Sequence, residues 1–151
     1  MAKRKSTTLR IGSISSGTMR PEDLFPLFLW ECNRLHLSHY ERHLVRNIAR
    51  AFHALPDEWS DEQTEQAGYL LEELTMFLEA HTPDYCTFGS HPGDGADFGV
   101  WPDWDALDDV FKGERADATQ ADYFCLESND HGNATLYRRA ANRWVKCWSV
   151  V

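Results

Sequence analysis

Six aspartates lie within 16 residues in the second half of the chain, interleaved with aromatic side chains. The acidic segment consists of these aspartates and two tryptophans, namely Asp94, Asp97, Trp101, Asp103, Trp104, Asp105, Asp108 and Asp109. Carboxylates spaced along a loop and a short helix can stand where the phosphates of DNA would, and a tryptophan can fill a pocket on a protein partner. We predict that the acidic segment binds a basic protein groove. A solvated acidic surface with both tryptophans in the core is the alternative.

The loop that opens the acidic segment suggests a second chemistry. His91, Asp94 and Asp97 flank glycines and could hold a cation, which would fit a small metal-dependent hydrolase. A phosphate cradle should end at a helix N-terminus, however, and a calcium loop needs regularly spaced oxygen ligands and a distal Glu. The loop leads into a predicted strand and has an incomplete ligand pattern. Glycines that adopt positive φ in a hairpin explain the same residues, so we predict no metal and no cofactor.

The remaining histidines do not form a recognisable catalytic motif. His39 and His43 are four residues apart and would share a helix face, as paired metal ligands do. No H-E-x-x-H arrangement accompanies them, so a polar helix face is expected. His131 lies in a predicted tight turn, where the neighbouring Asn, Asp and Gly are explained by the turn itself. No catalytic residue is predicted among these histidines.

The four cysteines are widely separated and include no C-x-x-C pair, which argues against a zinc site and against a thioredoxin-like motif. They are Cys32, Cys86, Cys125 and Cys147. Cys125 and Cys147 could face each other across neighbouring strands. In a reducing compartment all four are expected to be thiols of the core.

Apolar spacing predicts the helices that precede these residues. A strand is expected over Thr7–Ser15, followed by a helix from Pro21 to about Leu35 that starts late or kinks at Pro26. A capping box at Ser38 begins a second helix, which stops before Pro56. A second capping box and a long apolar stripe predict a third helix over about 61–80.

Short aromatic runs separated by turn residues follow the helices. They predict strands over 85–88, 97–101, 122–128, 134–139 and 143–150, with a short helix over 103–111. The predicted fold is therefore α+β, with an N-terminal strand, three helices and then an antiparallel β meander of about four to five strands. We expect residues 1–151 to form one domain with the helices on one face of a single sheet, and residues 1–6 to form a flexible basic tail.

Charge is strongly segregated along the 151 residues, whose net charge is −9. Residues 1–55 carry nine basic and four acidic side chains, a net charge of +5. Residues 56–137 carry 20 acids and two bases, a net charge of −18, and residues 138–151 carry four bases. The overall sign disfavours direct binding to nucleic acid, which requires a basic face. The acidic middle of the chain should instead attract a basic partner.

Three stretches of the chain resemble a group of small proteins encoded by bacteriophages and mobile elements. These stretches read SISSGTMRPEDL from Ser13, GDGADFGVWPD from Gly93 and NDHGNATLY from Asn129. The resemblance implies a bacterial cytoplasm under phage or plasmid control. Small acidic proteins in that setting include anti-CRISPR and other anti-defence inhibitors, which present carboxylates to basic nucleic-acid channels.

Charge and resemblance together predict a non-enzymatic, phage-type inhibitor of a host defence protein, such as an anti-CRISPR protein with a DNA-mimicking surface. The expected partner is a basic protein surface, for example that of a CRISPR effector or another nuclease. The alternatives are the metal-dependent hydrolase and a phage protein that self-associates through a sheet face containing Trp144 and Trp148. No apolar run is long enough for a membrane span, and no secretory signal is expected near the N-terminus. The predicted location is the bacterial host cytoplasm.

Overall fold

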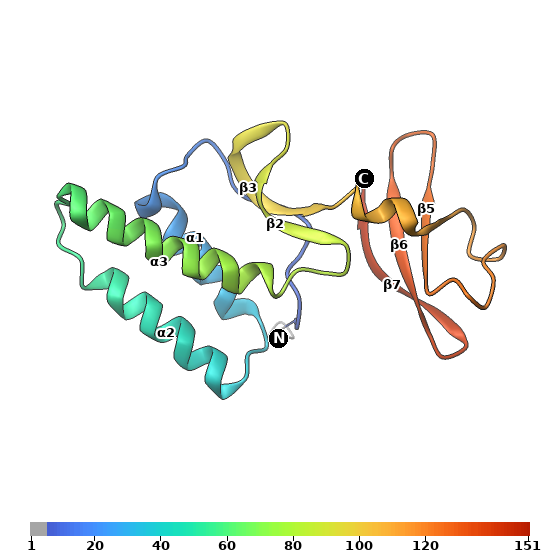
Figure 1. The fold of residues 1–151 in the computed structure, drawn as a ribbon, viewed down its shortest axis with the longest axis horizontal. Coiled ribbons are helices and arrows are strands. Elements are labelled where there is room, and N and C mark those ends of the chain that lie inside the picture. Colours follow the sequence, from blue (N-terminus) through green and yellow to red (C-terminus); the bar gives the residue numbers. More distant parts are fainter. Residues whose placement is uncertain (1–5) are drawn as a thin grey trace, which may run out of the picture. The chain divides into compact units, whose positions relative to one another are not determined.

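A computed structural model describes residues 6–151 of the protein. Most of the predicted basic tail, residues 1–5, lies outside the described residues. In the described part of the chain the fold is α+β, with three α-helices, one 3-10 helix and two sheets of three and four strands (Figure 1). The α+β class and the N-terminal strand are confirmed. The prediction of one meander of four to five strands is wrong, because seven strands divide between two sheets.

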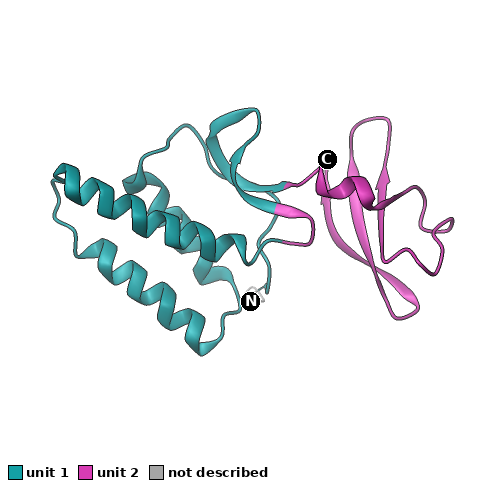
Figure 2. Cartoon of the chain, in the orientation of Figure 1, with its two compact units in different colours: residues 1–82, 87–101 teal, residues 83–86, 102–151 magenta. Residues whose placement is uncertain are grey.

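The chain divides into two compact units (Figure 2). Unit 1 comprises residues 1–82 and 87–101, and unit 2 comprises residues 83–86 and 102–151. Within the described residues, unit 1 holds the three α-helices and most of the three-stranded sheet, and unit 2 holds the four-stranded sheet. The boundary between Trp101 and Pro102 falls at the end of a strand, with no glycine- or proline-rich linker to mark it.

The first helix, α1 (Pro21–Arg34), begins where its sequence predicts. Proline suits the first helical turn because its missing N–H would have no helical partner there, and Glu22 and Asp23 favour the positive end of the helix dipole. Pro26 lies inside the helix, and the expected late start is wrong. One lost backbone hydrogen bond is tolerated because Phe25 and Phe28 on either side of Pro26 are fully buried.

The second and third helices, α2 (His39–His53) and α3 (Asp61–Glu79), start at the two capping boxes. The Ser38 and Ser60 side chains accept from the backbone N–H three residues later, and Glu41 and Gln63 reach back to the two cap residues. The predicted boundaries are therefore confirmed almost to the residue.

Glu41 also ties α2 to the end of α3. Its Oε1 lies 3.2 Å from Nε2 of His81, whose Nδ1 lies 2.8 Å from the carbonyl oxygen of Phe77. Hydrogen bonds from Ser38 are the main cause of the lowered pKa of Glu41, and His81 lowers it further. One carboxylate thus fixes both a helix start and a contact between two helices.

The sheet of unit 1 contains β1 (Gly12–Ser15), β3 (Asp94–Pro102) and β2 (Cys86–His91), in that order. β1 and β3 are antiparallel, and their backbones approach closely where Gly12 pairs with Val100 and Ser13 pairs with Gly99. A Cβ on Gly99 would lie 2.2 Å from the carbonyl oxygen of Gly12. The close pairing of β1 with β3 therefore requires glycine at position 99.

Aromatic side chains from the helices and from β2 and β3 build the core of unit 1. Phe25 of α1 stacks on Phe52 of α2, and Phe28 meets Phe88 of β2 edge to face at a centroid distance of 4.9 Å. Phe98 of β3 lies 6.0 Å from the same Phe28 ring. α1 thus packs against the sheet through one face and against α2 through another.

Unit 2 contains a four-stranded sheet in the order β4-β5-β6-β7. Its strands are β4 (Phe111–Lys112), β5 (Phe124–Ser128), β6 (Ala134–Ala140) and β7 (Arg143–Val150). β5, β6 and β7 form the predicted antiparallel hairpins, whereas β4 was not predicted and pairs parallel to β5. The helix predicted over 103–111 is a 3-10 turn, η1 (Ala106–Asp109).

The paired residues Leu126, Leu136 and Trp148 line one face of the sheet of unit 2, and all three are buried. The indole N–H of Trp148 donates to the carbonyl oxygen of Asp84 at 2.7 Å. Leu107 of η1 is also buried. This small core holds the segment that leads out of β3 and carries five of the eight predicted binding residues.

Candidate acidic binding surface

The unit boundary divides the acidic segment. Asp94, Asp97 and Trp101 belong to unit 1, whereas Asp103, Trp104, Asp105, Asp108 and Asp109 belong to unit 2. The two groups differ in how many of their side chains form hydrogen bonds or ion pairs within their own unit.

The three residues in unit 1 are bound by nearby groups. Asp94 accepts from the backbone N–H of Ala96 at 3.0 Å, and Asp97 accepts from the hydroxyl of Ser13 on β1. The indole N–H of Trp101 donates to the carbonyl oxygen of Gly89 at 3.0 Å. Asp94 therefore shapes a turn, while Asp97 and Trp101 link β3 to its two neighbouring strands.

The loop that could hold a cation is organised by the same kind of local bond. Nδ1 of His91 accepts from the backbone N–H of Gly93 at 3.0 Å, and the imidazole ring meets Trp101 edge to face at 4.7 Å. Within residues 6–151, no group of three or more His, Cys, Asp or Glu side chains lies close enough to hold a metal ion. His91, Asp94 and Asp97 are therefore not brought together as ligands.

In unit 2, two of the four aspartates of the acidic segment have structural partners. Asp103 accepts from the backbone N–H of Ala106 at 3.0 Å and so begins η1. Asp108 forms an ion pair with Lys112 at 2.8 Å, and the Lys112 ammonium lowers the pKa of the Asp108 carboxyl. Both residues shape the turn before β4, in addition to contributing negative charge.

The other two aspartates are free. Asp105 and Asp109 are exposed, and among residues 6–151 their carboxylates have no hydrogen-bond or ion-pair partner. Trp104 in the same segment has 51% of its surface exposed, with its ring edge to face against the buried Trp148. Unit 2 therefore presents a large aromatic side chain, of a type enriched among the anchors of protein interfaces, in a segment with two unpaired carboxylates.

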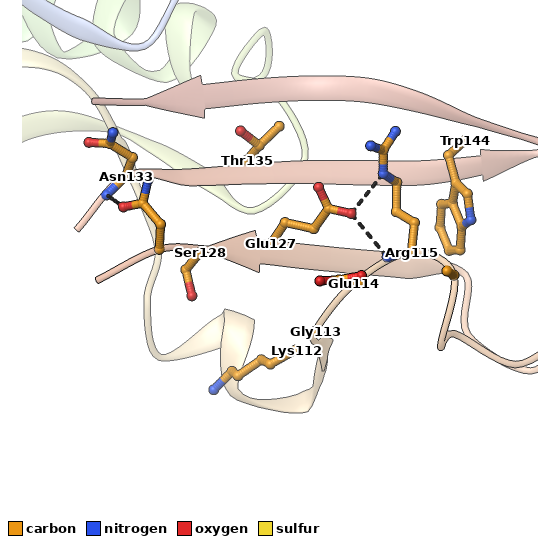
Figure 3. Close-up of a pocket in the computed structure, with 11 residues that line it drawn as sticks. Lys112, Gly113, Glu114, Arg115, Glu127, Ser128, Asn133, Thr135 and Trp144 are labelled. Carbon is orange, nitrogen blue, oxygen red and sulfur yellow. Dashed lines mark hydrogen bonds and ion pairs between the residues drawn. The ribbon is translucent and has the colours of Figure 1, made fainter. Parts of the chain in front are cut away.

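An open pocket of about 950 Å³ lies elsewhere in unit 2 (Figure 3). The Arg115 backbone N–H and Nε both donate to Oε1 of Glu127 on β5, at 3.0 and 2.8 Å, and Trp144 of β7 stands beside them. Lys112 extends away from this ion pair. The pocket joins the loop after β4 to three strands of the sheet.

Electrostatics within the pocket hold both ions in their charged forms. The hydrogen bond to Glu127 is the main cause of the raised pKa of Arg115. Burial opposes ionisation of Glu127, but the hydrogen bonds from Arg115 outweigh it and lower the pKa of Glu127. The Arg115 guanidinium also lies 3.9 Å from the centroid of the Tyr137 ring. Arg115 and Glu127 therefore neutralise each other within the pocket.

The sheet face next to the pocket uses its aromatic side chains internally. Arg139 lies over Trp144 at 4.4 Å from the ring centroid, and its guanidinium donates to the carbonyl oxygens of Thr119 and Asp122. Trp148 is buried on the opposite face. Trp144 and Trp148, which carried the prediction of self-association, thus point to different faces of one sheet.

Cys32, Cys125 and Cys147 lie in environments that raise the pKa of their thiols. Cys32, Cys125 and Cys147 are free thiols, and Cys32, Cys86 and Cys125 are buried. Burial raises the pKa of Cys32 to about 12, and burial together with the Asp84 carboxylate raises the pKa of Cys147 to about 11. A nucleophilic cysteine requires the opposite shift, toward a stable thiolate. The expected core thiols are confirmed for the three buried residues.

Exposed histidines occupy the positions that the sequence suggested. His39 and His43 lie on the solvent side of α2, and His131 lies in the exposed turn between β5 and β6. The side chain of Asn129 organises that turn by accepting from the backbone N–H of both His131 and Asn133. His131 itself makes no side-chain hydrogen bond within residues 6–151.

The sequence did not predict the pocket of Arg115, Glu127 and Trp144, because its walls come from segments up to 32 residues apart. No local spacing signals such a site. Comparison of the chain with protein-family models, curated proteins and solved structures gives no match. Within residues 6–151, no helix is both long and apolar enough to cross a membrane.

Proposed function

We propose that the protein binds a basic surface of another protein through the unit 2 part of the acidic segment and carries out no chemistry of its own. The observation that carries this proposal is the half-exposed Trp104 in a segment where Asp105 and Asp109 have no partner among residues 6–151. Carboxylates already paired inside the protein would lose those partners on binding, whereas free ones can meet cations without that loss. Trp104 supplies the apolar anchor that charge alone lacks.

The chemistry of the partner follows from this surface. Complementary charge and a slot for an indole describe a basic groove, of the kind that proteins use to hold a phosphate backbone. In the phage setting that the sequence resemblance implies, such a groove belongs to a defence nuclease, and a CRISPR effector is the leading example. Occupying the groove would exclude nucleic acid and inhibit the nuclease.

The acidic helix of unit 1 offers a matched comparison. α3 carries six acidic residues and no basic residue, and its Glu72 and Glu73 are exposed. They have no partner within residues 6–151. Replacing these two by lysine changes the net charge as much as replacing Asp105 and Asp109. A protein that acted only through its net charge would respond equally to both replacements.

Affinity capture tests the proposal. The wild-type protein, Asp105→Lys/Asp109→Lys and Glu72→Lys/Glu73→Lys are each immobilised and exposed to a bacterial lysate treated with nuclease, so that nucleic acid bridges no contact. Mass spectrometry should find a nucleic-acid-binding protein retained by the wild type and by the α3 variant, and lost from the Asp105 and Asp109 variant. Equal retention by all three forms, or equal loss from both variants, would contradict the proposed surface.

A direct assay follows from the capture. The captured protein should bind its nucleic acid more weakly when the wild-type protein is added, and Trp104→Ala should reduce this inhibition. An unchanged affinity for nucleic acid would show that the acidic surface is no mimic of phosphates.

A further inference from the structure

The outer face of α2 carries a basic stripe, defined here as His39, Arg42, His43, Arg46, Arg50 and His53. All six side chains are exposed. At 3.6 residues per turn they fall on one side of the helix, opposite the buried Val45 and Ile48. The one acid on α2, Glu41, is bound to Ser38 and to His81. No acid therefore interrupts the stripe.

The stripe leaves its charges close together and unbalanced. Arg42, Arg46 and Arg50 follow one another at intervals of four residues, a spacing at which like charges destabilise a helix. Arg42 donates to the carbonyl oxygen of Leu37 at 2.6 Å. The guanidinium groups of Arg46 and Arg50 have no hydrogen-bond or ion-pair partner among residues 6–151. An anionic ligand would relieve repulsion that the free protein retains.

We propose that the basic stripe of α2 binds the phosphate backbone of duplex DNA. Eight residues separate Arg42 from Arg50, which corresponds to about 12 Å along the helix axis. A strand of duplex DNA carries its phosphates in a regular row, so arginines spaced along the helix can each contact a successive phosphate. Guanidinium groups also match phosphate geometry better than any other side chain.

The composition of the stripe distinguishes duplex DNA from other anionic partners. Single strands are held by stacking bases on aromatic side chains, protein interfaces have an apolar centre, and membrane-surface helices bury an apolar face. The exposed apolar side chains of α2, Tyr40 and Leu44, lie about 120° and 160° around the axis from Arg46. The stripe itself has charge and no apolar centre, which suits contact with a rigid row of phosphates.

DNA binding by α2 is the opposite of what the net charge predicts, which is no direct binding to nucleic acid. A total of −9 slows the approach of DNA from a distance, yet contacts within about 8 Å depend on local charge at physiological salt. Binding should therefore be weak, independent of sequence and strongly reduced by salt. The basic stripe shares no residue with the acidic segment, so DNA binding by the stripe can be tested independently of the proposed function.

Fluorescence anisotropy with a labelled 20-base-pair duplex of arbitrary sequence tests the inference, at 50 mM salt and upward. The wild type should bind with a slope of log affinity against log salt of about −2.7, corresponding to three phosphate contacts. Arg46→Gln/Arg50→Gln should bind at least tenfold more weakly, with a slope near −0.9. Arg138→Gln/Arg143→Gln changes the net charge equally in unit 2 and should bind like the wild type.

Thermal melting separates lost binding from lost folding. Because Arg46→Gln/Arg50→Gln removes like-charge repulsion, its melting temperature should equal or exceed that of the wild type. Failure of the wild type to bind at 50 mM salt would overturn the inference, as would equal weakening by the Arg138 and Arg143 variant. Tighter binding to the same sequence as a single strand, or to vesicles containing phosphatidylserine, would overturn the assignment to duplex DNA.

Discussion

The two units arrange their charged side chains differently. In unit 1, α2 carries a basic stripe and α3 carries only acids, although Glu31 and Arg34 form an ion pair on α1. Unit 2 pairs opposite charges in the Arg115 to Glu127 and Lys112 to Asp108 contacts, and Asp105 and Asp109 are among its carboxylates that have no partner within residues 6–151. The proposed binding surfaces are thus one face of a helix in unit 1 and a segment with unpaired carboxylates in unit 2. Each pattern can be broken by a different kind of substitution.

Removal of a buried side chain should have the largest effect on stability, and the loss should be confined mainly to the unit that carries the substitution. Phe28→Ala removes the ring that meets Phe88 and Phe98, and should cost unit 1 about 4 kcal/mol in free energy of unfolding. Leu136→Ala should cost unit 2 about 3 kcal/mol. Hydrogen exchange read residue by residue should show protection lost mainly in the unit that carries the substitution. Equal loss throughout residues 6–151 would mean that the chain unfolds as one body.

A backbone substitution in unit 1 should have the next largest effect. In Gly99→Ala the new methyl carbon would meet the carbonyl oxygen of Gly12 at 2.2 Å, so β1 must move away from β3. We expect a loss of about 2 kcal/mol in urea denaturation. Gly95→Ala is the matched control, because nothing lies within 4 Å of the position its methyl would take. Equal stability of the two variants would contradict the close β1 to β3 pairing.

The capping box of α2 should contribute a smaller amount. Ser38→Ala removes the acceptor for the backbone N–H of Glu41 and should lower the free energy of unfolding by about 1 kcal/mol. Ser38→Asp restores an acceptor and should recover most of that loss. Thermal melting of the three forms measures both effects. If Ser38→Ala had the same melting temperature as the wild type, the cap would not stabilise α2.

Acid should weaken unit 2 through Glu127. The folded pKa of Glu127 lies below its usual 4.5, so its stabilising effect is complete above pH 4.5 and is lost as the pH falls through the lower folded value. The pKa values of Asp108 and Asp122 are lowered as well. Glu127→Gln should flatten the acid limb of the stability curve of unit 2. If the curve of Glu127→Gln superimposed on that of the wild type, Glu127 would not contribute to the loss of stability in acid.

The helices could be predicted from sequence because their signals are local. A capping serine and its partner three residues later, followed by an apolar stripe, mark α2 and α3 within a single window. Pro26 misled the same reasoning, because burial of Phe25 and Phe28 outweighs the lost hydrogen bond. Strands β5, β6 and β7 were visible through their turns for the same local reason.

The division of the chain and the engagement of the acidic segment could not be predicted. The boundary lies beside Trp101 inside a strand, and no change of composition marks it. Asp97 is held by Ser13, which lies 84 residues earlier, and Asp108 is held by Lys112. Spacing shows where carboxylates are, but the three-dimensional fold decides which of them remain free. Asp105 and Asp109 emerge as the free pair only after the others have found partners.

Calorimetric titration of the captured partner with the wild type and with Asp105→Lys/Asp109→Lys tests the proposed function most directly. Close charge pairs at a protein interface are worth about 1.5 kcal/mol or more each, so reversal of two carboxylates should raise Kd at least hundredfold. The affinity of the wild type should also fall as salt rises, while Glu72→Lys/Glu73→Lys should keep the Kd of the wild type. Equal Kd values for the wild type and the Asp105 and Asp109 variant would contradict the proposal.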